Sequence, residues 1–355
     1  MDNRTIKLGD IARECRQNWT GSQQGVPVVG LEHLEPGEIE LKVWDHDIEH
    51  TFSKKFQKGQ VLLGRRRVYL RKAVAAPFDG ICSGDITVIE ALDGIIPELL
   101  PFIIQNDRFF DFAMQGSAGS LSPRVKWEHL KNYQFSLPPL SEQKILAEKL
   151  WAAYRLKEAY KKLLVATDEM VKAKFVEMFG DPIKNTKMLP SRKGDVLFEF
   201  ASGKANTKSN LNDNNPYNCY GGNGITGKSD KWLLESPTLV IGRVGEYCGC
   251  VHRTTACSWI TDNAIYIKAI KEKVYDEDFL FYLMTYLDFH RLADETGQPK
   301  ITQRPLLLQE YIVPSLVLQQ RFVAIAQQAG KSIISLRKSI ESIDSVIKSL
   351  INNQE

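Results

Sequence analysis

The chain repeats its own sequence pattern after about 177 residues, and this repetition limits the possible architectures more than any other feature. The segment Val61–Ala91 is similar to the segment Leu239–Ala269, and Gly64-Arg65 aligns with Gly242-Arg243 at an offset of 178 (242 − 64). Two further pairs keep nearly the same offset: Asp85 with Asp262, and Pro138 with Pro314. The sequence therefore predicts two copies of one folding unit.

Each copy begins with a Gly-Asp pair, at Gly9-Asp10 and at Gly194-Asp195, and continues in short apolar runs separated by glycine and proline. Such runs are typical of short strands joined by turns. Each copy then ends in a long stretch with helical periodicity, so we expect an α+β fold. The expected parts are two pseudo-repeated β-rich domains at 1–140 and 184–314, separated by two long helices at 141–183 and 315–355.

Both helical stretches carry apolar residues at alternating steps of three and four, which is the spacing of a coiled-coil seam. The first stretch ends at Gly180-Asp181-Pro182, where glycine favours a helix cap and proline cannot continue the helix. We expect the two helices to pair as an antiparallel coiled coil; the alternative is an ordinary helical hairpin inside one core. The expected interface residues are Ala152, Leu156, Ala159, Leu163, Ala166, Met170, Ala173, Ile333, Leu336, Ile340, Ile343 and Ile347.

The composition is that of an ordinary globular protein, with 43% hydrophobic and 25% charged residues. No run approaches the roughly 20 apolar residues that span a membrane. The N-terminus lacks the basic-then-apolar pattern of a secretory signal, so we expect a cytoplasmic protein whose six cysteines are thiols.

A strongly basic run lies between Glu49 and Asp79, an interval without any acidic residue. If this run forms a strand, Arg65, Arg67 and Arg71 project from one face, which would be strongly cationic. Such a face neutralises phosphates, and arginine can also bind guanine in the major groove. The alternative is a charged sheet edge that resists aggregation.

Several segments resemble the specificity subunits of Type I restriction-modification systems, and the resemblance covers essentially the whole chain. Leu137–Gln143 resembles the start of that family's first spacer helix, and Phe179–Pro182 resembles its end. The second helix start departs from the first, because Leu318 stands where the first has Glu142. Three further segments resemble parts of its target-recognition domains: Leu62–Ala73, Tyr220–Gly227 and Ile241–Gly245.

The resemblance implies a non-catalytic subunit that recognises a bipartite, asymmetric site in double-stranded DNA. Each target-recognition domain reads a few base pairs, and the coiled coil sets the spacing between the half-sites. Two methyltransferase subunits dock on the chain, and restriction subunits join them for cleavage. S-adenosylmethionine, ATP and Mg²⁺ belong to those partners, and this chain binds no cofactor of its own.

The candidate DNA-binding residues come from the basic run, from its counterpart in the second copy and from loops rich in glycine, serine and lysine. Cations near glycine suit contacts with the phosphate backbone, although solvated loops have the same composition. The candidates are Arg65, Arg66, Arg67, Tyr69, Arg71, Lys72, Lys204, Lys208, Tyr220, Asn223, Lys228, Arg243, Lys300 and Arg304.

Three other patterns suggest different chemistry. Gly222–Ser229 satisfies GxxxxGK[ST], but no apolar strand precedes it, so we interpret it as a DNA-facing loop or a glycine turn. Asn215-Pro216-Tyr217 is one proline short of a methyltransferase tetrapeptide. Cys248, Cys250 and His252 share one face of a predicted strand, but their spacing is not that of a zinc knuckle, so buried thiols are expected. We predict neither a catalytic nor a metal site.

Two rival functions remain. An enzyme with its own methylase or NTPase site would need the cofactor motifs that are missing here. A stand-alone two-domain DNA-binding regulator would bind its operator without any partner subunit.

Overall fold

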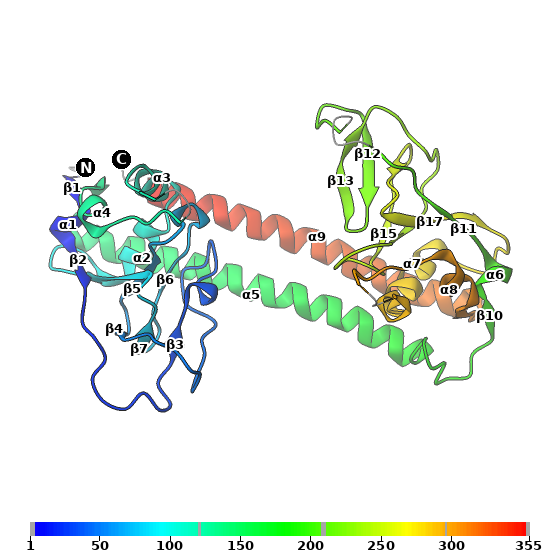
Figure 1. The fold of residues 1–355 in the computed structure, drawn as a ribbon, viewed down its shortest axis with the longest axis horizontal. Helices are drawn as coiled ribbons and strands as arrows, with labels where there is room; N and C mark the ends of the chain where they lie inside the picture. Colours follow the sequence, from blue (N-terminus) through cyan, green and yellow to red (C-terminus); the bar gives the residue numbers. More distant parts are fainter. Residues whose placement is uncertain (1–3, 120–121, 207–210, 295–296, 353–355) are drawn as a thin grey trace. The chain divides into compact units, whose positions relative to one another are not determined.

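The computed structural model describes residues 4–119, 122–206, 211–294 and 297–352 (Figure 1). The chain divides into two compact units: Met1–Leu163 with Leu336–Glu355, and Leu164–Ser335. Two long helices, α5 (Leu140–Phe179) and α9 (Leu316–Asn352), each contribute one part to each unit.

The first unit is built on a four-stranded antiparallel sheet of order β2-β8-β5-β6. The apolar runs VLLG and ITVI form the buried parts of its central strands, as expected for strands covered on both faces. A three-stranded sheet, β3-β7-β4, and a two-stranded sheet, β1-β9, complete the strands. The elements are β1 (Arg4–Lys7), α1 (Leu8–Ile11), β2 (Ala12–Cys15), β3 (Val28–Val29), η1 (Leu31–His33), β4 (Lys54–Phe56), β5 (Val61–Gly64), η2 (Val68–Leu70), β6 (Ala73–Ala75), β7 (Gly80–Cys82), β8 (Ile86–Ala91), η3 (Pro97–Leu99), α2 (Leu100–Ile104), α3 (Asp107–Gln115), α4 (Trp127–Leu130) and β9 (Gln134–Leu137).

The second unit repeats this plan. Its four-stranded antiparallel sheet has the order β11-β17-β14-β15, and it is accompanied by a three-stranded sheet, β13-β12-β16, and a two-stranded sheet, β10-β18. The elements are β10 (Ser191–Lys193), α6 (Gly194–Leu197), β11 (Phe198–Ser202), β12 (Tyr217–Gly221), β13 (Gly224–Ser229), β14 (Leu239–Gly242), β15 (Val251–Arg253), β16 (Trp259–Ile260), β17 (Ala264–Ile270), α7 (Glu277–Tyr286), η5 (Phe289–Leu292), α8 (Gln303–Leu308) and β18 (Glu310–Ile312).

The register of the large sheets agrees with the sequence repeat. Gly64 lies opposite Ile86 in the first unit, and Gly242 lies opposite Ala264 in the second, at the same offset of 178. This register places Asp85 in correspondence with Asn263, so the alignment of Asp85 with Asp262 is wrong by one residue.

The small sheets differ between the units. In the first, β7 is central, with β3 parallel to it and β4 antiparallel. In the second, β12 is central, with β16 parallel to it and the hairpin partner β13 antiparallel. The large sheet is therefore the repeated part of the fold, and the small sheet is the part that varies.

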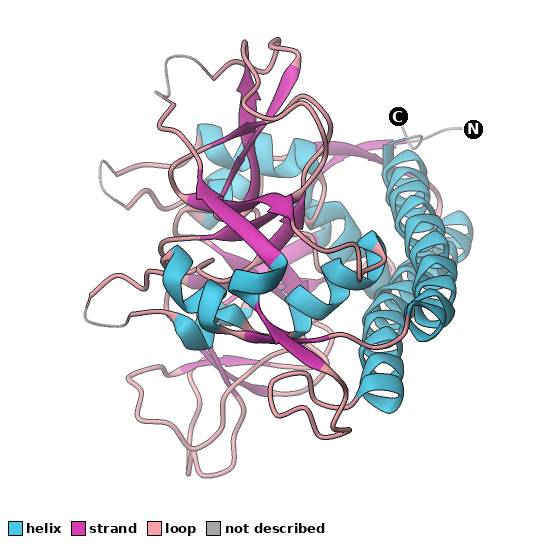
Figure 2. Cartoon of the chain, turned by 90° about the vertical axis from the view of Figure 1, so that its right-hand side faces the viewer, coloured by secondary structure: helices cyan, strands magenta, loops and turns pink. Residues whose placement is uncertain are grey.

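The two long helices run antiparallel within each unit. In the first unit the Lys157 Nζ donates to the Asp344 carboxylate at 2.6 Å. In the second unit the rings of Phe175 and Phe322 have centroids 5.4 Å apart. Within each unit, the parts of α5 and α9 that belong to it lie side by side (Figure 1 and Figure 2). The expected α+β fold, with two β-rich units and a pair of long antiparallel helices, is confirmed.

The predicted interface on α5 is wrong in its choice of face. The helix α5 instead packs through a stripe that includes Leu150 and Tyr154 in the first unit and Val171 and Phe175 in the second. Aromatic rings bury large apolar areas, so the face that carries them outweighs the more regular alanine repeat. All seven predicted positions are exposed: Ala152, Leu156, Ala159, Leu163, Ala166, Met170 and Ala173.

On α9 the predicted face does turn inward. Phe322, Ala326 and Ala329 belong to the core of the second unit. In the first unit Ile347 packs against the core beside the C-terminal turn. The five predicted positions are partly buried: Ile333, Leu336, Ile340, Ile343 and Ile347.

Candidate nucleic-acid interface

The arginine-rich part of the basic run, Arg65–Lys72, is a turn, so the strand considered for it does not form. The strand β5 ends at Gly64, and the 3-10 helix η2 follows between Arg67 and Arg71, which both have φ near +53°. The side chain of Val68 is 1% exposed and belongs to the core, and this burial bends the chain away from the sheet. The alternation of charge therefore does not produce one cationic face.

Internal partners take up part of the charge of this turn. Arg66 donates to the Ser122 hydroxyl at 2.6 Å and lies 3.5 Å from Asp85. Arg71 forms ion pairs with Asp107 and Asp111. Lys72 is likewise bound internally, since its Nζ donates to the Leu31 carbonyl at 2.8 Å.

Arg65, Arg67 and Tyr69 remain available to a ligand. Arg65 is held through its backbone, because its N–H donates to the Asp85 carbonyl at 2.9 Å and its carbonyl accepts from Val125 at 3.0 Å. In the described part of the chain its Nε is buried and has no hydrogen-bond acceptor. Arg67 is exposed, and Tyr69 is 52% exposed.

Arg124 reinforces this turn, and the sequence did not single it out. Its guanidinium donates to Asp85 at 2.7 Å and holds the pKa of that carboxyl below its usual value. The backbone of Arg124 also pairs with that of Arg66 in an antiparallel bridge. Four arginines therefore gather at one end of the large sheet: Arg65, Arg66, Arg67 and Arg124.

The second unit builds the corresponding turn around Arg243. The N–H of Arg243 donates to the Asn263 carbonyl, and its carbonyl accepts from Ile301, both at 2.9 Å. Its Nε is also buried without an acceptor among the described residues. The exposed Lys300 joins the turn through a backbone bridge with Val244.

The predicted glycine-rich loop is a β-hairpin, formed by β12 and β13. The prediction of Tyr220 as a DNA contact is wrong, because this residue is 4% exposed and its hydroxyl accepts a hydrogen bond from the Thr255 N–H at 3.1 Å. Asn223 lies exposed at the hairpin turn, and Lys228 lies exposed on β13. Since Gly224–Ser229 is a strand and the next helix among the described residues, α7, begins only at Glu277, this segment lacks the loop-to-helix geometry that binds nucleotide phosphates.

The remaining candidates lie on other segments of the second unit. Lys204 is exposed, and its carbonyl accepts from the Trp259 indole at 3.1 Å. Arg304 is exposed near the start of α8. Lys208 lies outside the described residues.

The cysteine pattern does not form the predicted strand face. The strand β15 begins at Val251, so Cys248 and Cys250 precede it. Cys248 is buried, and burial raises the pKa of its thiol; Cys250 is exposed, in contrast to the expected burial. Among the residues that the structure describes, no group of three His, Cys, Asp or Glu side chains could hold a metal ion.

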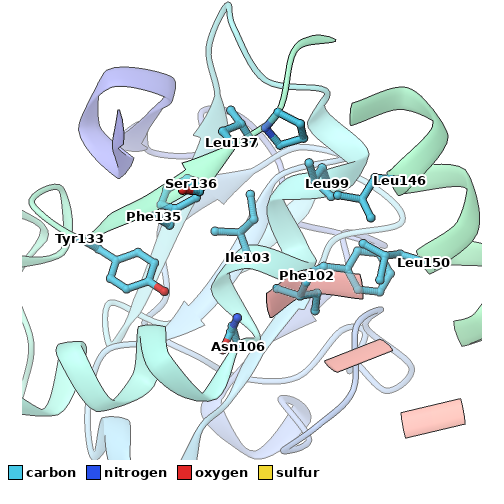
Figure 3. Close-up of a pocket in the computed structure, with 12 residues that line it drawn as sticks. Leu99, Phe102, Ile103, Asn106, Tyr133, Phe135, Ser136, Leu137, Leu146 and Leu150 are labelled. Carbon is cyan, nitrogen blue, oxygen red and sulfur yellow. The ribbon is translucent and has the colours of Figure 1, made fainter. Parts of the chain in front are cut away.

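Two other structural features bear on possible ligands. A cavity of about 30 Å³ in the first unit lies among apolar side chains that include Leu99, Phe102 and Leu150 (Figure 3). This volume is enough for about one or two water molecules and too small for a cofactor. No helix in the described ranges is both long and apolar enough to cross a membrane.

Comparisons with known proteins match part of the sequence and the fold. Residues 190–344 match the family model of the Type I restriction modification DNA specificity domain. The EcoprrI specificity subunit of a Type I restriction enzyme from Escherichia coli is 28% identical over 137 residues, which are 39% of this chain and 33% of that protein. The chain therefore matches about a third of the length of this curated relative.

Two solved structures share the fold at low sequence identity. The Type I restriction-modification S subunit of M. genitalium aligns with a TM-score of 0.62 and 13% identity, over 99% of this chain and 95% of that chain. A chain from a study of complex assembly and conformational transition in the type I R-M system aligns with a TM-score of 0.55 and 16% identity, over 100% and 98% of the two chains. Residues 190–344 therefore match the Type I restriction modification DNA specificity domain, and the chain as a whole shares the fold of the solved Type I S subunit.

Proposed function

We propose that this chain is the DNA sequence-specificity subunit of a Type I restriction-modification complex and that it recognises a bipartite, asymmetric site in double-stranded DNA. The observation that carries the proposal is a repeated turn, with Arg65 in one unit and Arg243 in the other. Each turn lies at the end of the four-stranded sheet of its own unit. Two similar cationic elements suit two half-sites, because cationic side chains provide most of the affinity for the phosphate backbone. We assign the recognition domains to 1–140 and 184–314.

The proposed DNA contacts are the exposed or partly exposed polar groups of both units. Tyr220 is removed from the candidates because it is buried, Lys208 lies outside the described residues, and Arg66, Arg71 and Lys72 are given structural roles because they have internal partners. The contacts that remain are Arg65, Arg67, Tyr69, Lys204, Asn223, Lys228, Arg243, Lys300 and Arg304.

We assign the docking of the methyltransferase to the exposed stripe of α5, which comprises Ala152, Leu156, Ala159 and Leu163 in the first unit, and Ala166, Met170 and Ala173 in the second. Leu156 and Met170 are each 45% exposed, and Leu163 is 49% exposed. Apolar and small residues at steps of three and four form the surface on which a partner helix packs. The opposite face of α5 is buried in the cores of the two units, whereas the positions of the stripe are exposed.

The chemistry of the complex then belongs to its other subunits. The two methyltransferase subunits bind S-adenosylmethionine, and the restriction subunits, where present, use ATP and Mg²⁺. The chain itself contributes the choice of DNA sequence and acts in the cytoplasm, where the DNA is. The segments 141–183 and 315–355 serve as the spacer helices.

Co-expression with the methyltransferase subunit of the same system tests the proposal. Sequencing of methylated bases in cellular DNA should reveal one bipartite motif that appears only when both chains are present. If the chain binds a DNA site tightly on its own and never co-purifies with the methyltransferase, it is a stand-alone regulator instead.

A further inference from the structure

The two turns that carry Arg65 and Arg243 share their backbone hydrogen bonds almost one for one. The Gly64 N–H donates to the Lys72 carbonyl at 2.9 Å, and the Gly242 N–H donates to the Cys250 carbonyl at 2.8 Å. A second hydrogen bond is also repeated: the Arg67 N–H donates to the Pro123 carbonyl, and the Gly245 N–H donates to the Pro299 carbonyl. The turns therefore have a similar conformation, although only the first contains a 3-10 helix.

The shared conformation includes two positions with positive φ. Gly245 and Gly249 occupy them in the second unit, with φ of +85° and +88°. Arg67 and Arg71 occupy them in the first, although a left-handed conformation is unfavourable for a residue with a side chain. Arg71 is held there by two aspartates, whereas Arg67 is exposed, and such strain is commonly retained where the side chain is needed for function.

The same side chains recur at the same places on both turns. An arginine with a buried, unpartnered Nε follows the first glycine, as Arg65 and Arg243. An exposed tyrosine lies four residues later, with Tyr69 52% and Tyr247 44% exposed. A cation on the neighbouring loop completes each set: Arg124 bridges to Arg66, and Lys300 bridges to Val244.

A bipartite asymmetric site presents different bases to the two units, so an element that is the same in both cannot distinguish the half-sites. Contacts with the phosphate backbone position a protein on DNA without reading its sequence. The small sheet is where the units differ. In the second unit β13 pairs with β12 as a hairpin, whereas in the first unit β4 pairs with β7. Two half-sites with different bases need recognition elements that differ between the units, and the small sheets differ in this way.

We infer that the turns 64–72 and 242–250 are equivalent anchors for the DNA backbone, with Arg65, Tyr69, Arg243 and Tyr247 as their contact residues, and that sequence is read mainly by the small sheets. This inference rests on the proposed function and assigns the anchoring and reading roles to different parts of each unit. Tyr247 is a contact that the sequence did not suggest.

The test uses the complex of this chain with its methyltransferase subunits and measures the affinity for a duplex with the target motif and for a random duplex over a range of salt concentrations. Arg243→Gln should weaken binding to both duplexes by the same factor, about tenfold, since a hydrogen bond to a charged group contributes about 1.5 kcal/mol or more. The slope of log K against log salt should fall by nearly one. Arg65→Gln should have the same effect, and the methylated motif should stay unchanged in both variants.

Two matched variants separate charge from sequence reading. Arg243→Lys keeps the cation and should keep most of the salt slope. Lys228→Ala in the hairpin should instead weaken binding to the target duplex more than to the random duplex, or relax the motif in one half-site. Unchanged melting temperatures and co-purification with the methyltransferase verify that each variant is folded and assembled.

Each result bears on the inference separately from the function. If Arg243→Gln alters the methylated motif while random-duplex binding stays the same, the turn reads bases and the inference is wrong. It is also wrong if neither affinity nor slope changes. A wild-type complex that shows no preference for any DNA sequence would overturn the proposed function itself.

Discussion

Gln143 and Gln319 make the same three kinds of hydrogen bond at the same place in the two units. The Gln143 Oε1 accepts from the Ile96 N–H at 2.9 Å, and its Nε2 donates to the carbonyls of Gly94 and Pro138 at 3.1 and 2.9 Å. The equivalent bonds of Gln319 are made to Asp276 at 2.8 Å, Val274 at 2.9 Å and Pro314 at 2.8 Å. The two glutamines are 2% and 0% exposed, so each fixes the start of a long helix to the loop beside it.

Gln319→Ala should destabilise the second unit, because it leaves one buried and two partly buried backbone groups without partners. One unsatisfied buried group costs about 1–3 kcal/mol, so we expect a loss of about 3 kcal/mol in the free energy of unfolding, measured with urea. Gln320→Ala is the matched control, since Gln320 is the neighbouring glutamine and is exposed. A loss below about 1 kcal/mol for Gln319→Ala would show that water replaces the side chain.

Glu38 should make the first unit sensitive to acid. Burial by itself raises the pKa of this carboxyl, but hydrogen bonds from Lys161, Lys42 and Tyr154 outweigh it and lower the pKa to about 2, from 4.5. Because the folded pKa lies below the unfolded one, the stabilisation is present above about pH 4.5 and is lost as the pH falls toward 2. A shift of this size corresponds to about 3 kcal/mol at neutral pH.

Glu38→Gln should therefore lower the unfolding free energy near neutral pH and flatten its dependence on pH between about 4.5 and 2. Glu40→Gln, two residues away and exposed, is the control. Chemical denaturation of both variants at several pH values measures the effect. Parallel pH profiles for Glu38→Gln and the wild type would mean that another group dominates the acid transition.

The sequence predicted the repeat, the fold class and the two helices, because these depend on patterns that extend over many residues. It did not predict the turn at Arg65–Lys72, because the alternation of charged and apolar residues has a strand period and the burial of Val68 is a tertiary effect. Nor did it predict the buried face of α5, since this helix carries two apolar stripes and their competition is decided by packing with other elements. Arg124 and Tyr247 could have been found from the repeat, because Lys300 corresponds to Arg124 at an offset of 176 (300 − 124) and Tyr69 corresponds to Tyr247 at an offset of 178 (247 − 69).

The two glycines that precede the anchor arginines should respond differently to alanine. A Cβ at Gly242 would lie 2.1 Å from the Tyr247 carbonyl oxygen and 2.5 Å from that of Gly222, and both contacts are with backbone. A Cβ at Gly64 would meet the Leu31 side chain at 3.2 Å and Lys72 at 3.4 Å, which small side-chain shifts relieve. Gly242→Ala should cost about 2 kcal/mol or more and Gly64→Ala less than about 1 kcal/mol. Equal losses in thermal unfolding would show that the turn of the second unit has room to adjust.

Substitutions on the exposed stripe of α5 should separate assembly from folding. Leu156 is 45% and Leu163 is 49% exposed, so glutamate at either position should change the unfolding free energy by less than about 0.5 kcal/mol. At the centre of a helix–helix interface the same charge would be buried without a partner, and we expect affinity for the methyltransferase subunit to fall at least tenfold. Val165→Glu is the matched control, because Val165 is 59% exposed on the same helix but lies outside the stripe. Co-purification and titration with the methyltransferase measure the effect. If Leu156→Glu and Leu163→Glu assemble as tightly as the wild type and as Val165→Glu, the partner binds elsewhere on the chain.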